Sequence, residues 1–174
     1  MKIRLIRLCS PWLLAGVLLV GVSAAGAQST LILESKIPLG DVRGRLDHMA
    51  VDLRRQRLFV AELENDSVGV VDFGRREIAH VITEVRRPQG LAYVPAADTL
   101  FVANGGDGSL RMFAGANYQA LEPLHVGEDA DNVRYDPESN LIYVAYGEGA
   151  LAIVDVASRK RRRTRCASRE FSTR

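Results

Sequence analysis

Three pairs of mostly polar residues recur along the chain, and their chemical types suit the binding of a small ligand. Each pair lies 42 residues after the one before it. The pairs are Asp47-His48, Gln89-Gly90 and Asp131-Asn132. Carboxylate, imidazole and amide groups together could bind a cation or a small polar ligand. Alternatively, such residues satisfy backbone groups at strand ends and line a water-filled channel. The sequence leaves both interpretations open.

Patterns typical of enzymes and metal sites are weak in this chain. One histidine beside Asp47 and Asp131 falls short of the three or four ligands of a zinc site. The turn at 104–109 lacks the acidic spacing and terminal glutamate of a calcium loop. No serine lies in a nucleophile elbow, and no glycine motif joins a strand to a helix as in nucleotide-binding folds. His80 and His125 fall on predicted outer strands. We therefore expect no catalytic residue, no metal site and no cofactor.

The elements that must position the three pairs are short strands that repeat at the same interval. Segments 59–61 and 101–103 both have the sequence Phe-Val-Ala, and 143–145 has Tyr-Val-Ala, again 42 residues apart. Apolar residues in each unit alternate with a period of two, which indicates β-strands. Polar or glycine-rich turns separate these strands. No segment after the first 27 residues has a helical stripe.

Four antiparallel strands in about 40 residues are typical of one β-propeller blade. The sequence therefore predicts an all-β fold, a β-propeller of four-stranded antiparallel blades, with repeats at about 46–87, 88–130 and 131–158. Val60, Val102 and Val144 should be buried equivalents. Innermost strands of neighbouring blades would bring the three polar pairs to one central channel. The segment Leu31–Leu39 is expected to be a leading strand without partners of its own.

The repeat also resembles a known family. Phe-Val-Ala-Glu at 59–62, Phe-Val-Ala-Asn at 101–104 and Tyr-Val-Ala-Tyr at 143–146 resemble the signature of the YVTN-type β-propeller repeat. Their wider context resembles the YncE-like exported propeller proteins of bacteria. None of the three units has the threonine of the signature, and only the second has its asparagine, Asn104. Members of this family usually have about seven blades. The resemblance thus implies an incomplete, apparently truncated propeller of about three to three and a half blades.

The two ends of the chain differ in composition from the part between them. Residues 1–27 combine basic residues, an apolar run and a small-residue end, which is typical of a secretory signal peptide cleaved after Ala27. An uncleaved membrane anchor is the alternative, but the apolar run is short for one. We expect the basic tail 159–174 to be disordered. It is either an arm for nucleic acid or a membrane surface, or a segment foreign to the fold that arises from a frameshift. The strand pattern stops in the middle of a blade, which favours a foreign segment over an arm.

Charge and cysteine content narrow the class of partner. Residues 28–158 carry 12 basic and 20 acidic residues, a net charge of −8, which argues against a nucleic-acid partner. Cys9 and Cys166 lie outside this part, so it has no disulfide or thiolate chemistry. We expect a periplasmic or secreted protein with no stable membrane span after signal cleavage. Open strand edges would favour self-association.

Three functions remain compatible with the sequence. The favoured one is a non-catalytic exported scaffold for binding a protein or a small ligand. The second is a subunit or fragment of a quinoprotein-dehydrogenase-like or lactonase-like enzyme. The third is a truncated product without independent activity. Fold alone does not separate these functions.

Overall fold

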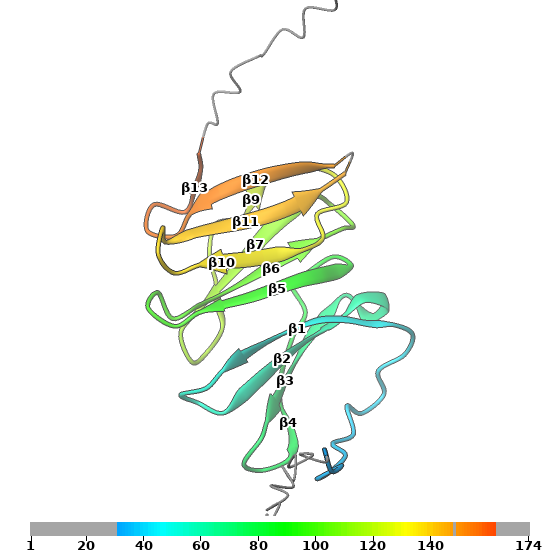
Figure 1. Ribbon diagram of the computed structural model, residues 1–174. Coiled ribbons are helices and arrows are strands. Elements are labelled where there is room, and N and C mark those ends of the chain that lie inside the picture. The colour runs from blue at the N-terminus through cyan, green and yellow to red at the C-terminus, as the bar shows by residue number, and fades with distance from the viewer. Residues whose placement is uncertain (1–30, 148, 163–174) are drawn as a thin grey trace, which may run out of the picture. The chain divides into compact units, whose positions relative to one another are not determined.

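The computed structural model describes residues 31–147 and 149–162. Residues 31–34 belong to a separate unit, and the fold described below belongs to the unit that begins at Ser35. It contains three antiparallel sheets in chain order (Figure 1). The one helical element in the described residues is a short 3-10 turn, η1 (Leu63–Asn65). The predicted all-β fold of four-stranded blades is therefore confirmed, and we refer to the sheets as blades 1 to 3.

Blade 1 is built from four strands in the order of the sequence. They are β1 (Leu46–Asp52), β2 (Arg57–Glu62), β3 (Ser67–Asp72) and β4 (Glu77–Ile82). The two central strands are rich in valine and contain one aromatic residue, Phe59, which suits a pleated surface buried on both sides. A left-handed residue, Asp66, closes the β2–β3 connection after η1, in the turn that the polar residues 64–67 predicted.

Blade 2 repeats this arrangement with a divided outer strand. Its first three strands are β5 (Pro88–Val94), β6 (Thr99–Asn104) and β7 (Ser109–Ala114). The fourth position is shared by two short strands that both pair with β7, namely β8 (Gln119–Ala120) and β9 (Leu124–His125). His80 on β4 and His125 lie on outer strands, as predicted, and both are exposed.

Blade 3 extends further along the chain than the sequence pattern indicated. Its strands are β10 (Val133–Asp136), β11 (Leu141–Tyr146), β12 (Ala150–Asp155) and β13 (Lys160–Arg161). The boundary predicted at residue 158 is therefore too early, because β13 pairs with β12. The sequence pattern did not reveal β13, because polar residues form the turn that leads to it. In this turn the backbone N–H of Ser158 donates to Asp155 Oδ1 at 2.8 Å. In blade 1, Arg75 donates in the same way to Asp72 Oδ1 at 2.9 Å before β4.

The backbone itself repeats at the interval found in the sequence. Left-handed residues occur at Gln56, Asp98 and Asn140, with φ of 53°, 45° and 55°. All three occupy the turn between the first and second strands of their blades. A left-handed conformation is uncommon outside glycine, so its recurrence at one position of every blade shows that the units share a backbone and not merely a composition.

The blades pack face to face around apolar cores. We call the side of a blade that contacts the next blade its forward face and the opposite side its backward face. One core joins the forward face of blade 1 to the backward face of blade 2, and a second core joins blades 2 and 3 in the same way. Val60, Val102 and Val144 are 1 %, 0 % and 0 % exposed, which confirms them as buried equivalents.

The segment before blade 1 differs from its prediction. Leu31–Leu39 was expected to be a strand, yet residues 31–45 contain no strand. A β-strand needs a partner strand for its backbone groups, and none of the sheets in the described part of the chain includes this segment. The segments assigned to the signal peptide and to most of the basic tail lie outside the described residues.

Candidate functional site

Four of the five candidate residues come together where β1 passes the segment before β10. His48 Nε2 lies 3.4 Å from the side-chain amide nitrogen of Asn132, although the two residues are 84 positions apart. His48 Nδ1 lies 3.0 Å from Asp47 Oδ1 and 4.0 Å from Asp131 Oδ1. We call Asp47, His48, Asp131 and Asn132 the inner-strand cluster. The structure thus brings residues of blade 1 beside residues of blade 3.

Irregularities in the inner strands position these side chains. The β1–β2 register shifts between Leu46 and Met49, and the β5–β6 register shifts at the equivalent place, between Pro88 and Leu91. Such bulges release residues from the regular ladder and re-aim their side chains. His48 lies inside the first shift.

Gly90, inside the second shift, allows the close approach of blades 2 and 3. A Cβ at this position would lie 1.8 Å from the carbonyl oxygen of Asp131 and 2.8 Å from the backbone nitrogen of Val133. Both contacts are with backbone atoms that cannot move aside, so only glycine fits. The backbone of Asp131 therefore lies directly against β5, which fixes the start of blade 3 relative to the cluster.

The inner-strand cluster contains polar atoms without hydrogen-bond partners among the described residues. They are His48 Nδ1 and Asn132 Oδ1, both buried as atoms. The short distance from His48 Nδ1 to Asp47 therefore lacks the geometry of a hydrogen bond. Because the Asn132 amide nitrogen can only donate, His48 Nε2 must accept, and the proton of a neutral ring is then assigned to Nδ1. Leaving a buried acceptor unpaired costs about 1–3 kcal/mol. A ligand whose donor group reaches Asn132 Oδ1 would remove this cost, which favours binding.

Gln89, the fifth candidate, is engaged in a different contact. Its side chain is buried, and its amide nitrogen donates to Asp129 Oδ1 at 3.2 Å. A Cβ on Gly105 would lie 2.0 Å from the same amide nitrogen, so the amide is packed against the β6–β7 turn. Gln89 thus connects this turn to the loop before blade 3.

A hollow of about 350 Å³ borders the inner-strand cluster on blade 3. Asp131 lines it together with Asp129, Tyr146 and Leu151. Its size falls at the lower end of the range for small-molecule sites. The side chain of Asp131 is 48 % exposed, so the cluster is open to solvent on this side.

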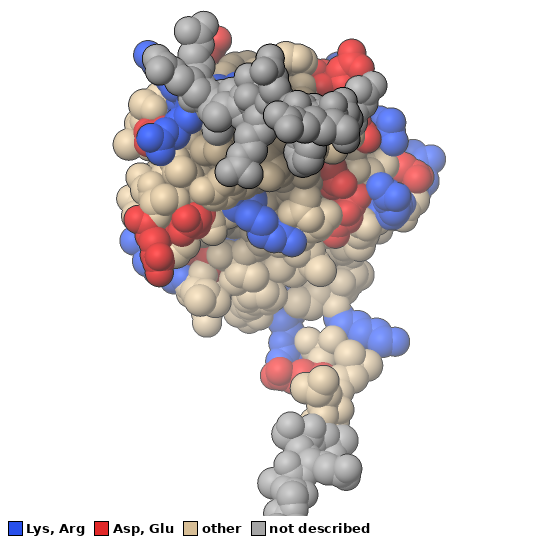
Figure 2. Space-filling view, turned by 45° about the horizontal axis from the view of Figure 1, so that its top comes forward, with Lys and Arg blue, Asp and Glu red and all other residues tan. Residues whose placement is uncertain are grey.

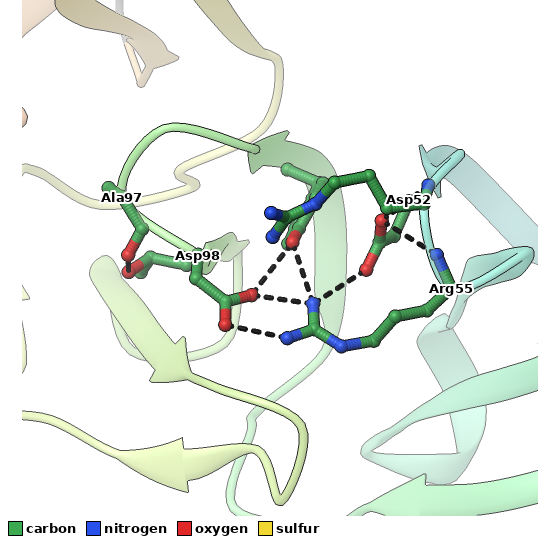
Figure 3. A network of polar contacts seen from close by, with 7 residues as sticks. Asp52, Arg55, Ala97 and Asp98 are labelled. Atoms are coloured by element: carbon green, nitrogen blue, oxygen red, sulfur yellow. Dashed lines mark hydrogen bonds and ion pairs between the residues drawn. The ribbon is translucent and has the colours of Figure 1, made fainter.

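At the opposite end of β1, a polar network joins blades 1 and 2 (Figure 3). The two terminal nitrogens of Arg55 donate to the two carboxylate oxygens of Asp98, both at 2.7 Å. One of them also donates to Asp52 at 2.9 Å and to the Tyr93 hydroxyl at 3.0 Å, and that hydroxyl donates to Asp98 at 2.7 Å. We call Asp52, Arg55, Tyr93 and Asp98 the interblade clamp. Sequence reasoning missed it.

The pKa values of the clamp indicate a structural role. The hydrogen bond from Arg55, followed by that from Tyr93, lowers the pKa of Asp98 to about 2. Burial raises the pKa of Asp52, but hydrogen bonds from Arg55 outweigh it and the pKa lies below its ordinary value. Burial, together with the hydrogen bond to Asp98, raises the pKa of Tyr93. Neither carboxyl group titrates near neutral pH, so neither suits proton transfer there.

Charged groups on the face drawn in Figure 2 show no dominant sign. On the face in Figure 2, acidic and basic side chains are interspersed over the parts that the grey atoms leave visible. Among residues 31–147 and 149–162, no three or more His, Cys, Asp or Glu side chains form a group that could hold a metal ion. The same residues include no helix with the length and apolar character of a membrane span.

Comparison with known proteins supports the fold. The structure is similar to hydrazine synthase of Kuenenia stuttgartiensis, with a TM-score of 0.64 and 19 % sequence identity over 76 % of this chain. The match covers 38 % of that protein, so the present chain spans well under half of its length. No protein-family model matches the chain, and neither does a curated protein. In all, 523 solved chains match, so the likeness identifies a widespread fold and no single function.

Proposed function

We propose that this chain is a non-catalytic, exported β-propeller scaffold that binds a small positively charged ligand at the inner-strand cluster. The observation that carries the proposal is the convergence of His48 and Asn132 from blades 1 and 3, between two carboxylates. The resemblance to YncE-like exported propellers and the composition of the leader support a periplasmic or secreted location.

The chemistry of the cluster determines the class of ligand. Asn132 Oδ1 is a buried acceptor without a partner in the described chain, so the ligand must present a hydrogen-bond donor. Asp47 is already paired with Arg45 at 3.0 Å, so Asp131, which lies 4.0 Å from His48 Nδ1, is the carboxylate that favours a positive charge on the ligand. A primary ammonium group supplies both features, and the neighbouring hollow of about 350 Å³ accommodates the short aliphatic chain that carries it.

Nuclear magnetic resonance of the histidine rings tests this proposal. The chain has three histidines, and His80 and His125 serve as internal controls because both lie on outer strands. Titration with the diamine putrescine should shift the ring signals of His48 alone, and the dicarboxylate succinate should not. The Asn132→Ala variant should lose the effect. Equal shifts at all three histidines, or none at His48, would contradict the proposal.

No observation favours the enzyme alternative. A quinoprotein-dehydrogenase-like or lactonase-like protein uses a metal or a cofactor at its channel, and the cluster offers one imidazole and two carboxylates. A larger partner would instead engage exposed strand edges, which pair readily with another chain.

A further inference from the structure

Both junctions between blades are built by equivalent positions. At the first junction, the forward face of blade 1 packs on the backward face of blade 2. The residues are Phe59, Ala61, Val68 and Val70 against Leu91, Leu100, Val102 and Phe113. The second junction uses the positions one repeat later, namely Phe101, Ala103, Leu110 and Met112 against Val133, Ile142, Val144 and Val154. One pattern of apolar side chains therefore joins any blade to the next.

The same pattern is present on two faces that no further blade of the described chain covers. On the backward face of blade 1, Met49 is 61 % exposed, whereas its equivalents Leu91 and Val133 are 4 % and 1 % exposed. Val60 and Val71 on the same face are 1 % and 2 % exposed, so this face is open at Met49 and not at its centre. On the forward face of blade 3, Leu151 is 60 % exposed, whereas its equivalent Leu110 is fully buried. Isolated exposed apolar residues are ordinary, but these occupy the positions that form both junctions.

We propose that these two faces bind each other in a second copy of this chain, head to tail. The forward face of blade 3 in one copy would pack on the backward face of blade 1 in the other, and the reverse contact would close the pair. The three described blades of two copies would give a ring of about six blades, within the range of about four to eight for closed propellers. A head-to-tail interface of this kind closes into a ring if its rotation permits.

The residues at the clamp position differ from junction to junction. At the first junction Arg55 pairs with Asp98. At the second junction both positions are uncharged, with Ala97 and Asn140. At the proposed junction the equivalent residues are Ser139 and Gln56, so no arginine is buried there. Asp136, the equivalent of Asp52, would be buried with the Ser139 hydroxyl as its partner in place of an arginine, and this cost weakens the junction.

Arg134 on the forward face of blade 3 also departs from the pattern. Its equivalents at the two existing junctions are alanines, Ala50 and Ala92, and Ala92 is buried in the core. The guanidinium of Arg134 donates to the carbonyl oxygen of Val133 at 2.9 Å. Packing over this side chain costs its desolvation, so the junction should be reversible, and Arg134→Ala should tighten it.

Sedimentation equilibrium of the full chain tests the proposal. We expect a reversible dimer, and Met49→Lys or Leu151→Lys alone should weaken it by about tenfold or more. Both side chains are exposed in the single copy, so either lysine should leave folding intact, which circular dichroism checks. The matched control is Leu53→Lys. Leu53 is 84 % exposed in a turn whose equivalent, Pro95, stays exposed between two blades.

Mixing the two lysine variants separates this interface from any other. The mixture contains one intact pair of faces and one pair that carries two lysines, so the two variants should form an open one-to-one dimer more tightly than either variant associates with itself. A chain that stays monomeric at every concentration would overturn the proposal and leave the faces to blades of a different protein. Dimers that survive both substitutions, a mixture that fails to associate, or filaments in place of a dimer would also overturn it.

Discussion

Asp98 and Arg55 connect blades 1 and 2 through two parallel hydrogen bonds. The contribution of these bonds to stability should depend on pH. The folded pKa of Asp98, about 2, lies below its ordinary value of 3.8. Its contribution to stability is therefore fully present above pH 3.8 and is lost as the pH falls toward 2. Asparagine fits the left-handed backbone at this position, because Asn140 has the same conformation in blade 3.

We expect Asp98→Asn to lower the free energy of unfolding by about 1–2 kcal/mol at neutral pH. The value is modest because the Asp98 side chain is 35 % exposed. Urea unfolding should show the difference shrinking as the pH is lowered through this window. Exposed Asp41→Asn serves as the control and should change little. A difference that stays constant with pH would contradict the assigned pKa.

Gly90 offers a second test at single-residue scale. The methyl group of Gly90→Ala would collide with the backbone of Asp131, so blade 3 must move away from β5. We expect a loss of about 1–3 kcal/mol in unfolding free energy and a weaker response of His48 to putrescine. Gly74→Ala is the matched control, since its nearest neighbour is the end of the Asp72 side chain at 3.3 Å. Equal stability of both variants would show that the approach of blades 2 and 3 is looser than described.

The sequence anticipated the position of the cluster but not that of the clamp. Residues 47, 89 and 131 repeat at one interval, and an interval is visible without a structure. Arg55 and Asp98 are exceptions to the repeat, because their equivalents in the other blades are uncharged. The signal that could have revealed the clamp was the presence of opposite charges, Arg55 and Asp98, in equivalent turns of adjacent blades. Gln89 was predicted to join the cluster, but its side-chain amide donates to Asp129 instead, a contact that depends on side-chain packing that a pattern does not show.

Among the strands, β6 gives the clearest stability prediction. Val102 lies at the centre of blade 2 and is fully buried, so Val102→Ala should lower the free energy of unfolding by about 1–4 kcal/mol. Arg111→Ala, on the neighbouring strand, removes a partly exposed ion pair with Glu84 and should cost about 1 kcal/mol or less. Thermal unfolding of both variants shows which of the two substitutions lowers stability more. The reverse order would show that the strand register is wrong.

The last strand of blade 3 makes a further prediction. Arg161 on β13 donates to the Tyr146 hydroxyl at 2.9 Å and lies over its ring at 5.6 Å. A chain that ends at Ser158 loses these contacts, whereas a chain that ends at Arg162 keeps them. We expect the shorter chain to be less stable by about 1 kcal/mol. If thermal unfolding finds the two truncated chains equal, β13 does not contribute to the blade.

Strand existence was easier to predict than strand ends. The short apolar runs of β2, β6 and β11 identified the blades, because a strand that is buried on both faces needs a continuous apolar run, which is visible in sequence. β13 has two basic residues and no alternation, and it forms because the turn after Asp155 returns the backbone to β12. The segment Leu31–Leu39 has an apolar pattern but forms no strand, since pairing requires a partner as well as a pattern.

For the whole molecule, the central claim is that three equivalent blades bring residues from distant parts of the chain to one site. The contact between His48 and Asn132, 84 positions apart at 3.4 Å, exists only if blades 1, 2 and 3 pack in sequence around their inner strands. No local structure within one blade produces it.

A nuclear Overhauser experiment on the full chain tests this claim most directly. We predict a cross-peak between the ring hydrogens of His48 and the side-chain amide hydrogens of Asn132. Asn132→Ala should remove that peak and leave the other assigned contacts of His48 in place. If both side chains give sharp, assigned signals and no cross-peak connects them, the blades do not converge as described.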